Sequence, residues 1–335
     1  MGVELRREQL VAELLDPRNG FERTRLPLEV RWDPLTGQSC RLLPAGSIPA
    51  PARHDLARLA EQSRDACPFC GDRLDRETPR FPAEVCEEGR FRSGEAVLFP
   101  NLVPYAKWSS VSVYSADRHL LPIDELSPSL VADNLETQVR FAAAVLSHDP
   151  SSSWVSINAN HLPPSGSSVF HPHLQGSANP MATTMQRLLA GVDPADVRAY
   201  VETERERGER FIAGGAVEWL AAFAPLGPAE LRAFVFGAAS PAELRADVVR
   251  ELAEGISAGL RVYAGLGFES FNLALYGAPP ATPGYALSLR LVARAYYGPA
   301  RRSDAMWSER LHWESATDLA PEHLADLARA GFANP

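Results

Sequence analysis

The feature of this 335-residue chain that most constrains its fold is an order of predicted elements that occurs twice. In each half, two strand-like runs precede one long amphipathic segment, and two further strand-like runs follow it. Strands that arrive in adjacent pairs are typical of antiparallel sheets, on which the long segments would pack as helices. The two halves barely match residue by residue, so the repetition is one of fold. The expected helices are 124–147 and 241–266, and the expected strands are 95–101, 109–115, 154–160 and 169–177, then 216–225, 231–238, 270–277 and 285–297.

We therefore expect an α+β fold built as a duplication, with antiparallel sheets and helices packed on them. The two halves would be residues 1–180 and 181–335. A charged helix over about 196–211 would link them, and a last helix would begin near Pro321. Residues 1–60 carry several proline-rich turns and are expected to be irregular.

Composition excludes several classes of function. The chain has 33 Lys and Arg against 42 Asp and Glu, a formal net charge of −9, which argues against non-specific binding of nucleic acid. No apolar run approaches the roughly 20 residues that span a bilayer. The first fifteen residues mix charged and apolar side chains and lack the apolar core of a signal peptide. We expect a cytoplasmic enzyme with neither a membrane nor a nucleic acid as its partner.

Two of the four cysteines, Cys67 and Cys70, have the spacing that lets two thiolates bind one metal ion. Tetrahedral zinc needs two further ligands. His119 lies at the end of a predicted strand, and His171 begins an H-x-H sequence, so these four residues could complete a closed, structural zinc site. The alternative is that the CPFC sequence is a turn without metal and that His119 lies on the surface.

The stretch SSVFHPHLQGSANP, residues 167–180, alternates polar and apolar side chains. Read as a strand, it places His171, His173 and Gln175 on one face. If His171 binds metal, His173 keeps a free nitrogen, and a neutral imidazole is a competent nucleophile toward phosphorus. Its other nitrogen should then donate to a backbone carbonyl. In the alternative reading, His173 is a second zinc ligand or an exposed strand residue.

The residues around this histidine could bind a phosphoryl group. The Gln175 amide can donate a hydrogen bond to a phosphoryl oxygen. The residues just upstream are small, so backbone amides and hydroxyls could approach a phosphate closely. They are Ser165, Gly166, Ser167 and Ser168.

Together these residues resemble the galactose-1-phosphate uridylyltransferase family, a branch of the histidine-triad superfamily. The family motif H-P-H-x-Q is similar to residues 171–175, and the family also has a CxxC pair like Cys67 and Cys70. An asparagine that ends a strand and contacts the nucleotide resembles Asn101. The remaining similarities are a zinc-ligating histidine like His119, an asparagine like Asn160, and a glycine–serine turn like Gly166-Ser167-Ser168.

The resemblance implies a duplicated histidine-triad-like fold, usually dimeric, with a structural Zn²⁺. It also implies a ping-pong reaction, in which His173 takes UMP from a UDP-sugar, releases sugar 1-phosphate and passes UMP to a second sugar 1-phosphate. Gln175 would bind the phosphoryl group. Positions that read the hexose phosphate differ here, with Ala316 in place of a glutamine, which favours an acceptor other than galactose 1-phosphate. The strand-borne histidines of a second metal site are absent.

Two other functions stay open at this point. A nucleotide-sugar phosphorylase or hydrolase on the same scaffold would pass the nucleotide to phosphate or water, and a zinc-stabilised nucleotide-binding module would not catalyse at all. In the second half, Arg290 and Arg294 share one face of a strand and could bind an anionic group, or they could be solvated on an outward face.

Overall fold

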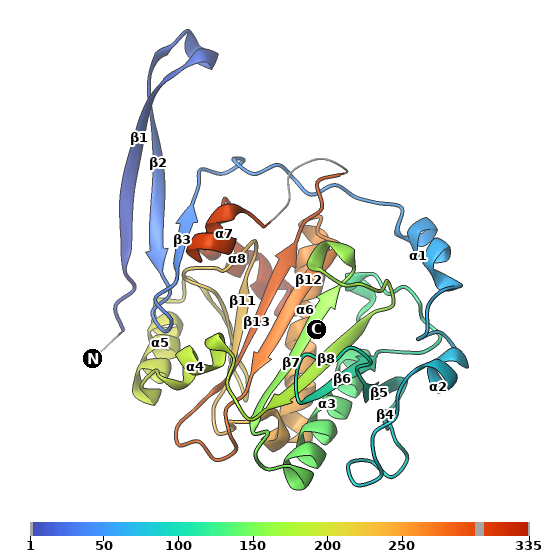
Figure 1. The fold of residues 1–335 in the computed structure, drawn as a ribbon. Coiled ribbons are helices and arrows are strands. Elements are labelled where there is room, and N and C mark those ends of the chain that lie inside the picture. The colour runs from blue at the N-terminus through green and yellow to red at the C-terminus, as the bar shows by residue number, and fades with distance from the viewer. Residues whose placement is uncertain (1–2, 299–304, 334–335) are drawn as a thin grey trace.

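The computed structural model describes residues 3–298 and 305–333 (Figure 1). Its centre is a ten-stranded antiparallel sheet to which both halves of the chain contribute. The two halves meet where β7 pairs with β12. In spatial order the strands are β4 (Phe91–Ser93), β5 (Ala96–Pro100), β6 (Trp108–Val113), β8 (His173–Asn179), β7 (Trp154–His161), β12 (Ser270–Tyr276), β13 (Leu287–Arg294), β11 (Leu231–Val235), β10 (Glu218–Ala221) and β9 (Phe211–Ala213).

The strand order confirms the predicted duplication. Going inward from each edge, the order is β4-β5-β6-β8-β7 in one half and β9-β10-β11-β13-β12 in the other. The two long helices occupy matching places along the chain. α3 (Pro128–His148) lies between β6 and β7, and α6 (Ala246–Gly265) lies between β11 and β12. The α+β class is therefore confirmed. The division of the chain at residue 180 stays a prediction.

One face of the sheet is covered by helices. α3 and α6 pack against each other, and α8 (Pro321–Phe332) packs on α6. Inward-facing side chains of the central strands, such as Ile157, Leu273 and Leu289, form the main core with these helices. Burying each such side chain stabilises the fold by about 1.5–3 kcal/mol. Alternate residues of the same strands must therefore point to the opposite face.

The opposite face has two separate covers. Over the first half lies the segment with α1 (Leu56–Arg64) and α2 (Arg73–Glu77), which packs Phe69 on Phe99. Over the second half lies α5 (Pro194–Arg207), which packs Tyr200 on Phe234. The central strands β7 and β12 lie between the two covers and carry polar side chains there. This arrangement leaves a pocket at the middle of the sheet.

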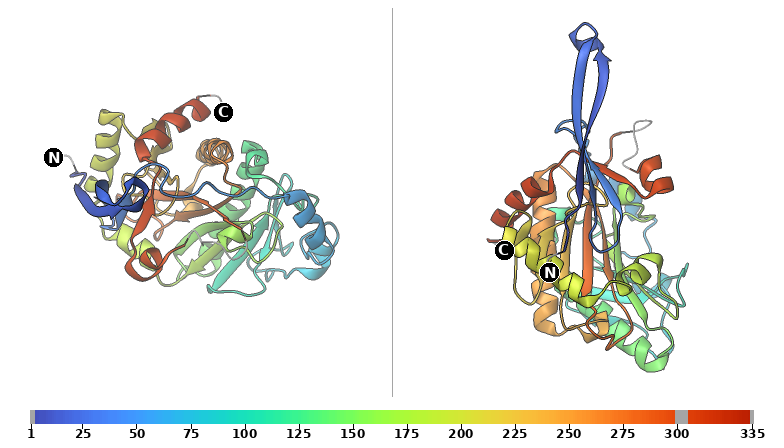
Figure 2. Two further views of the ribbon diagram at one scale, coloured as in Figure 1. Left: turned by 90° about the horizontal axis from the view of Figure 1, so that it is seen from above. Right: turned by 90° about the vertical axis from the view of Figure 1, so that its left-hand side faces the viewer.

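The prediction that residues 1–60 are irregular was wrong. β1 (Arg7–Asp16) and β2 (Glu22–Trp32) form a long antiparallel hairpin that projects from the body (Figures 1 and 2). With β3 (Ser39–Leu42) and β14 (Ser315–Thr317) it makes a second, four-stranded sheet. Pro27, which suggested a turn, lies inside β2 opposite Val11.

Other boundaries also differ from the prediction. The strand expected over 169–177 begins only at His173, so His171 and Pro172 precede it. A helix that was not expected, α4 (Thr184–Ala190), precedes α5 and begins with a capping box formed by Thr183 and Gln186. α7 (Trp307–His312) was not expected either. None of the described helices combines the length and the apolar character that crossing a bilayer requires.

Candidate functional site

The four predicted metal ligands come together in the structure. One ligand atom from each of Cys67, Cys70, His119 and His171 lies within 4.8 Å of the others. The sulfur of Cys70 is 3.1 Å from Nδ1 of His119 and 3.4 Å from Nδ1 of His171. The cysteines lie in the turn between α1 and α2, His119 follows β6, and His171 immediately precedes β8. Four ligands from three segments of the chain therefore converge on one point.

The far nitrogens of both imidazoles are held by other groups. Nε2 of His171 lies 2.7 Å from the carbonyl oxygen of Ser115, so it donates there and leaves Nδ1 as an acceptor facing the thiols. Nε2 of His119 lies 2.9 Å from Oγ of Ser63. Burial lowers the pKa of His171 to about 4, so the ring is neutral. Two thiols and two neutral imidazoles fit a borderline-soft tetrahedral ion, and the cluster could bind a metal.

A second metal cluster was not expected. Within residues 3–298 and 305–333, no other group of three or more His, Cys, Asp or Glu side chains comes together in this way.

His173 begins β8 and lies outside the cluster. Its Nδ1 is 2.9 Å from the carbonyl oxygen of His171, and because a carbonyl only accepts, Nδ1 carries the proton. Burial lowers the pKa of His173, although the hydrogen bond to His171 opposes this effect. The ring is therefore neutral near pH 7, and Nε2 keeps its lone pair. The ring of Phe69, which lies between the two cysteines, is 5.9 Å from that of His173.

Gln175 follows on the same face of β8 and lies opposite Asn158 of β7. The hydroxyl of Tyr105 donates to its Oε1 at 3.0 Å. The amide then presents its Nε2 as a donor. Gly176, the next residue, can only be glycine without rearrangement, because a Cβ there would lie 2.3 Å from the side-chain oxygen of Gln138. The sequence prediction missed Tyr105, which comes from a loop far from the motif.

The small residues predicted to bind phosphate form the loop before His171. Gly166 has a φ of 96°, a conformation that favours glycine. The Ser165 hydroxyl donates to the carbonyl oxygen of His161 at 2.9 Å, and the Ser167 hydroxyl donates to that of Val169 at 2.6 Å. These hydroxyls therefore stabilise the loop itself.

Asn101 lies just after β5, where the prediction places it. Its Oδ1 accepts a hydrogen bond from the backbone N–H of Val103 at 3.1 Å, which shapes the following turn. The apolar side chains of Leu102 and Val103 are exposed in this turn. The turn leads to Tyr105 and so to Gln175.

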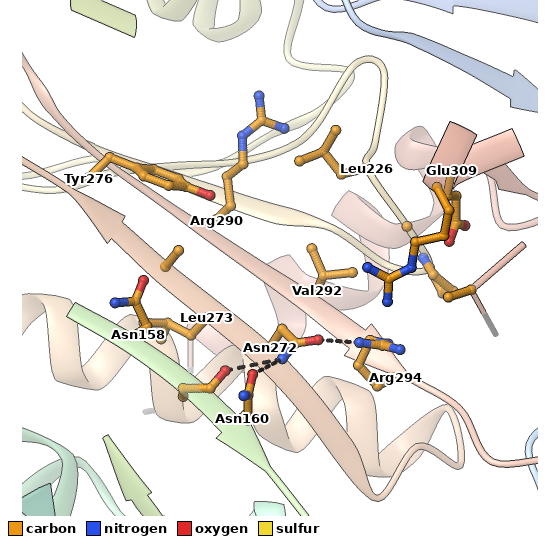
Figure 3. A pocket seen from close by; sticks show the side chains of 16 residues that line it. Asn158, Asn160, Leu226, Asn272, Leu273, Tyr276, Arg290, Val292, Arg294 and Glu309 are labelled. Carbon is orange, nitrogen blue, oxygen red and sulfur yellow. Dashed lines mark hydrogen bonds between the residues drawn. The ribbon is translucent and has the colours of Figure 1, made fainter. Parts of the chain in front are cut away.

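A pocket of about 400 Å³ lies at the centre of the sheet (Figure 3). Asn158 and Asn160 of β7 and Asn272 of β12 line its floor. Nδ2 of Asn272 donates to Oδ1 of Asn160 at 2.6 Å. Only Asn160 was predicted, although the alternation in residues 156–160 places Asn158 on the same face.

Arg290 also lines the pocket, but its side chain is buried and its charge is paired with two carboxylates. Its guanidinium is buried and bonds Asp33 at 2.9 Å and Glu230 at 2.7 Å. Burial alone would raise the pKa of Asp33, but Arg232 and Arg290 lower it to about 2. The expectation of an outward, solvated arginine was therefore wrong. Arg294 instead contacts Oδ1 of Asn272.

Comparison with known proteins gives one relative and several similar structures. No protein-family model matches the chain. A protein of Archaeoglobus fulgidus, described as uncharacterized, is 30% identical over an alignment of 344 positions that covers 98% of this chain and 98% of that protein.

The similar structures share far less sequence. A GalT-like protein from Arabidopsis thaliana is 17% identical, with a TM-score of 0.65 over 90% of this chain and 98% of that chain. An ADP-glucose phosphorylase from Arabidopsis thaliana with bound ADP-glucose has the same identity and coverage and a TM-score of 0.66. A uridylyltransferase is 19% identical, with a TM-score of 0.58 over 91% of this chain and 98% of that chain. These are likenesses of fold.

Proposed function

Because this chain belongs to one family with the Archaeoglobus fulgidus protein and has the fold of GalT-like proteins, we propose that it is a nucleotidyltransferase acting through His173. The observation that carries this proposal is the state of one ring. His173 is neutral, its Nδ1 proton is held by a carbonyl, and its Nε2 lies outside the metal cluster. Gln175 lies on the same face of β8 as His173 and pairs with Asn158 of β7, which supports a role near this ring.

In the first half-reaction, Nε2 of His173 attacks the α-phosphorus of a nucleotide sugar. The bond from that phosphorus to the bridging oxygen breaks, and sugar 1-phosphate leaves with the electron pair. The ring becomes positively charged, and its Nδ1–H bond to the carbonyl of His171 strengthens as that charge develops. Positioning matters more than acid–base chemistry, because sugar phosphate is a good leaving group.

In the second half-reaction, an oxygen of a second sugar 1-phosphate attacks the same phosphorus. The nitrogen–phosphorus bond breaks, and its electron pair returns to Nε2. Nε2 of Gln175 donates to a non-bridging oxygen in both steps, because its Oε1 is already occupied by Tyr105. Asn101 and Asn160 hold the nucleotide, and the backbone of Gly166, Ser167 and Ser168 approaches the phosphates.

Cys67, Cys70, His119 and His171 would hold a structural Zn²⁺. A bound ion would cross-link the three segments that carry these ligands and would contribute free energy of folding. The protein atoms around the cluster connect it to the reaction. His171 supplies the carbonyl that orients His173, and Phe69, between the two cysteines, packs beside the His173 ring.

A phosphorylase is the second candidate. Its support is the likeness of fold to the ADP-glucose phosphorylase, whose TM-score of 0.66 compares with 0.58 for the uridylyltransferase. The two functions share His173 and the first half-reaction, and they differ in the acceptor. We take UMP as the nucleotide transferred, sugar 1-phosphate as the acceptor, a homodimer as the assembly and the cytoplasm as the compartment.

The test is covalent labelling followed by discharge. The chain is incubated with UDP-glucose or ADP-glucose labelled at the α-phosphorus, and labelled protein is measured after denaturation. We expect label on the unmodified chain and on His323→Ala, a change at an exposed position of α8, and none on His173→Ala. Glucose 1-phosphate should then remove the label. Removal by inorganic phosphate alone favours the phosphorylase, and no label with either donor contradicts both candidates.

A further inference from the structure

The Asn272 side chain joins the two halves of the chain at the floor of the pocket. It lies on β12, but its Nδ2 donates to groups of the first half. Oδ1 of Asn160 is 2.6 Å away, the carbonyl oxygen of Ser165 is 3.1 Å away, and that of Ala159 is 3.2 Å away. Its Oδ1 accepts from the guanidinium of Arg294 (Figure 3). One amide therefore contacts a nucleotide-binding candidate, the phosphate-binding loop and a strand of the second half.

The chemistry of Arg294 fixes the direction of these hydrogen bonds. A guanidinium has donors and no acceptor, so it must meet the oxygen end of the Asn272 amide. The nitrogen end of Asn272 therefore faces Asn160. Because that nitrogen can only donate, it must meet the oxygen end of the Asn160 amide. In the series Arg294, Asn272 and Asn160, each donor therefore sets the orientation of the next side chain.

The series ends with a donor at the loop before His171. With its Oδ1 occupied, Asn160 presents Nδ2, which lies 4.0 Å from the position that a Cβ on Gly166 would have. Gly166 belongs to the loop that is expected to approach the phosphates. Among the described residues, Nδ2 of Asn160 has no hydrogen-bond acceptor.

We propose that Asn272 is a positioning residue, which with Arg294 holds the Asn160 amide so that its N–H points toward the nucleotide. The inference rests on the proposed function and assigns a task to the second half of the chain. Hydrogen bonds of this kind polarise one another, so the terminal donor is strengthened as well as oriented. Arg294, which the sequence suggested as a binding residue for an anion, would instead act through Asn272 and Asn160.

The proposal makes different predictions for two substitutions of Asn272. Alanine removes the orienting donor and lets the Asn160 amide rotate. Aspartate has no donor, so Asn160 must turn its Nδ2 toward the new carboxylate and its oxygen toward the phosphates. We expect Asn272→Ala to slow labelling of His173 about tenfold and Asn272→Asp to slow it on the order of a hundredfold.

A double-mutant cycle tests the coupling. Single-turnover labelling rates are measured for the unmodified chain, Asn160→Ala, Asn272→Ala and the double variant, with unfolding midpoints as a check on folding. In the Asn160→Ala background, we expect Asn272→Ala to lower the labelling rate by about twofold at most. Asn272→Asp should then slow labelling no more than Asn272→Ala does. The matched control is the cycle with Asn158→Ala, which should be additive because no bond joins Asn158 to Asn272.

The outcomes are distinguishable. Full additivity between Asn160 and Asn272, in a chain that labels normally, overturns the inference and leaves the proposed function in place. An unmodified chain that takes no label from any nucleotide sugar overturns the proposed function and this inference together. If Asn272→Ala does not fold, Asn272→Ser replaces it, because the serine hydroxyl keeps one donor and one acceptor. An equal loss of labelling rate with Asn160 and with Asn160→Ala again overturns the inference.

Discussion

Nδ1 of His173 lies 2.9 Å from the carbonyl oxygen of His171, whose own Nδ1 faces the sulfur of Cys70 at 3.4 Å. His171 and His173 belong to one motif but differ in their surroundings, and a hydrogen bond to the backbone connects them. The side chain of His171 belongs to the cluster, while its carbonyl fixes the tautomer of the next histidine. Any change that moves the cluster should therefore also disturb His173, the proposed nucleophile.

Removal of one thiol should release the metal and destabilise the chain. We expect the purified protein to contain about one zinc per chain and Cys70→Ser to contain little, with a lower unfolding midpoint. Elemental analysis and calorimetry measure the two effects. Cys86→Ser is the matched control, because Cys86 lies outside the cluster and its thiol donates to the carbonyl oxygen of Arg90 at 3.2 Å. Full zinc content in Cys70→Ser would contradict the assignment.

The stability of the fold should fall in mild acid, partly because of His161. Burial, with the nearby His173 adding to its effect, lowers the pKa of His161 to about 3. An unfolded histidine titrates near 6.5, so the unfolded state takes up a proton first, and stability is lost as the pH falls below 6.5 toward 3. At pH 5 this one group should lower the free energy of unfolding by about 2 kcal/mol relative to pH 7.5.

His161→Phe tests this contribution, because the ring already stacks on Phe271 at 4.9 Å. Urea unfolding at pH 7.5 and pH 5 gives the loss of stability for each protein. We expect the loss to be smaller in the phenylalanine variant by about the amount attributed to His161. An equal loss in both proteins would mean that His161 is not the group that titrates.

Tyr105 should affect catalysis through Gln175. Loss of the hydroxyl in Tyr105→Phe frees the Gln175 amide to rotate, so we expect kcat to fall about threefold to tenfold with little change in KM. Steady-state kinetics at saturating donor measure the split. In a Gln175→Ala background the same change should have little effect, and an undiminished effect there would show that Tyr105 acts in another way.

Arg290 should matter for stability rather than for acceptor binding. Arg290→Ala leaves Asp33 and Glu230 buried with fewer partners, and breaking a buried pair in this way costs about 3–5 kcal/mol. Denaturant unfolding measures the loss. A variant of unchanged stability with a raised KM for the acceptor would instead support direct binding of an anion by Arg290.

Local patterns predicted much of the fold. Paired strand-like runs around two amphipathic segments gave the duplicated sheet, since each run has a clear period and a clear boundary. The hairpin of β1 and β2 was missed because its prolines suggested turns, and Pro27 is accommodated in a strand that projects into solvent. The strand with His173 was expected to begin earlier, because alternation continues through residues that do not pair.

The site was predictable where local spacing or the family resemblance indicated a residue, as for His119 and Asn160. The Cys67–Cys70 pair and the sequence from His171 to Gln175 carry their chemistry in their spacing. Asn272 does not, because its partner Asn160 lies 112 positions away and the contact depends on the pairing of β7 with β12. The ion pairs of Arg290 likewise depend on Asp33, from the segment that was expected to be irregular.

The most direct test is to map the covalent adduct. The chain is incubated briefly with a nucleotide sugar, quenched at alkaline pH, where phosphoramidates survive, and analysed as peptides by mass spectrometry. We predict one nucleoside monophosphate per chain, on the peptide that contains His173 and on that imidazole. An adduct on any other residue, or turnover that persists in His173→Ala, would contradict the account.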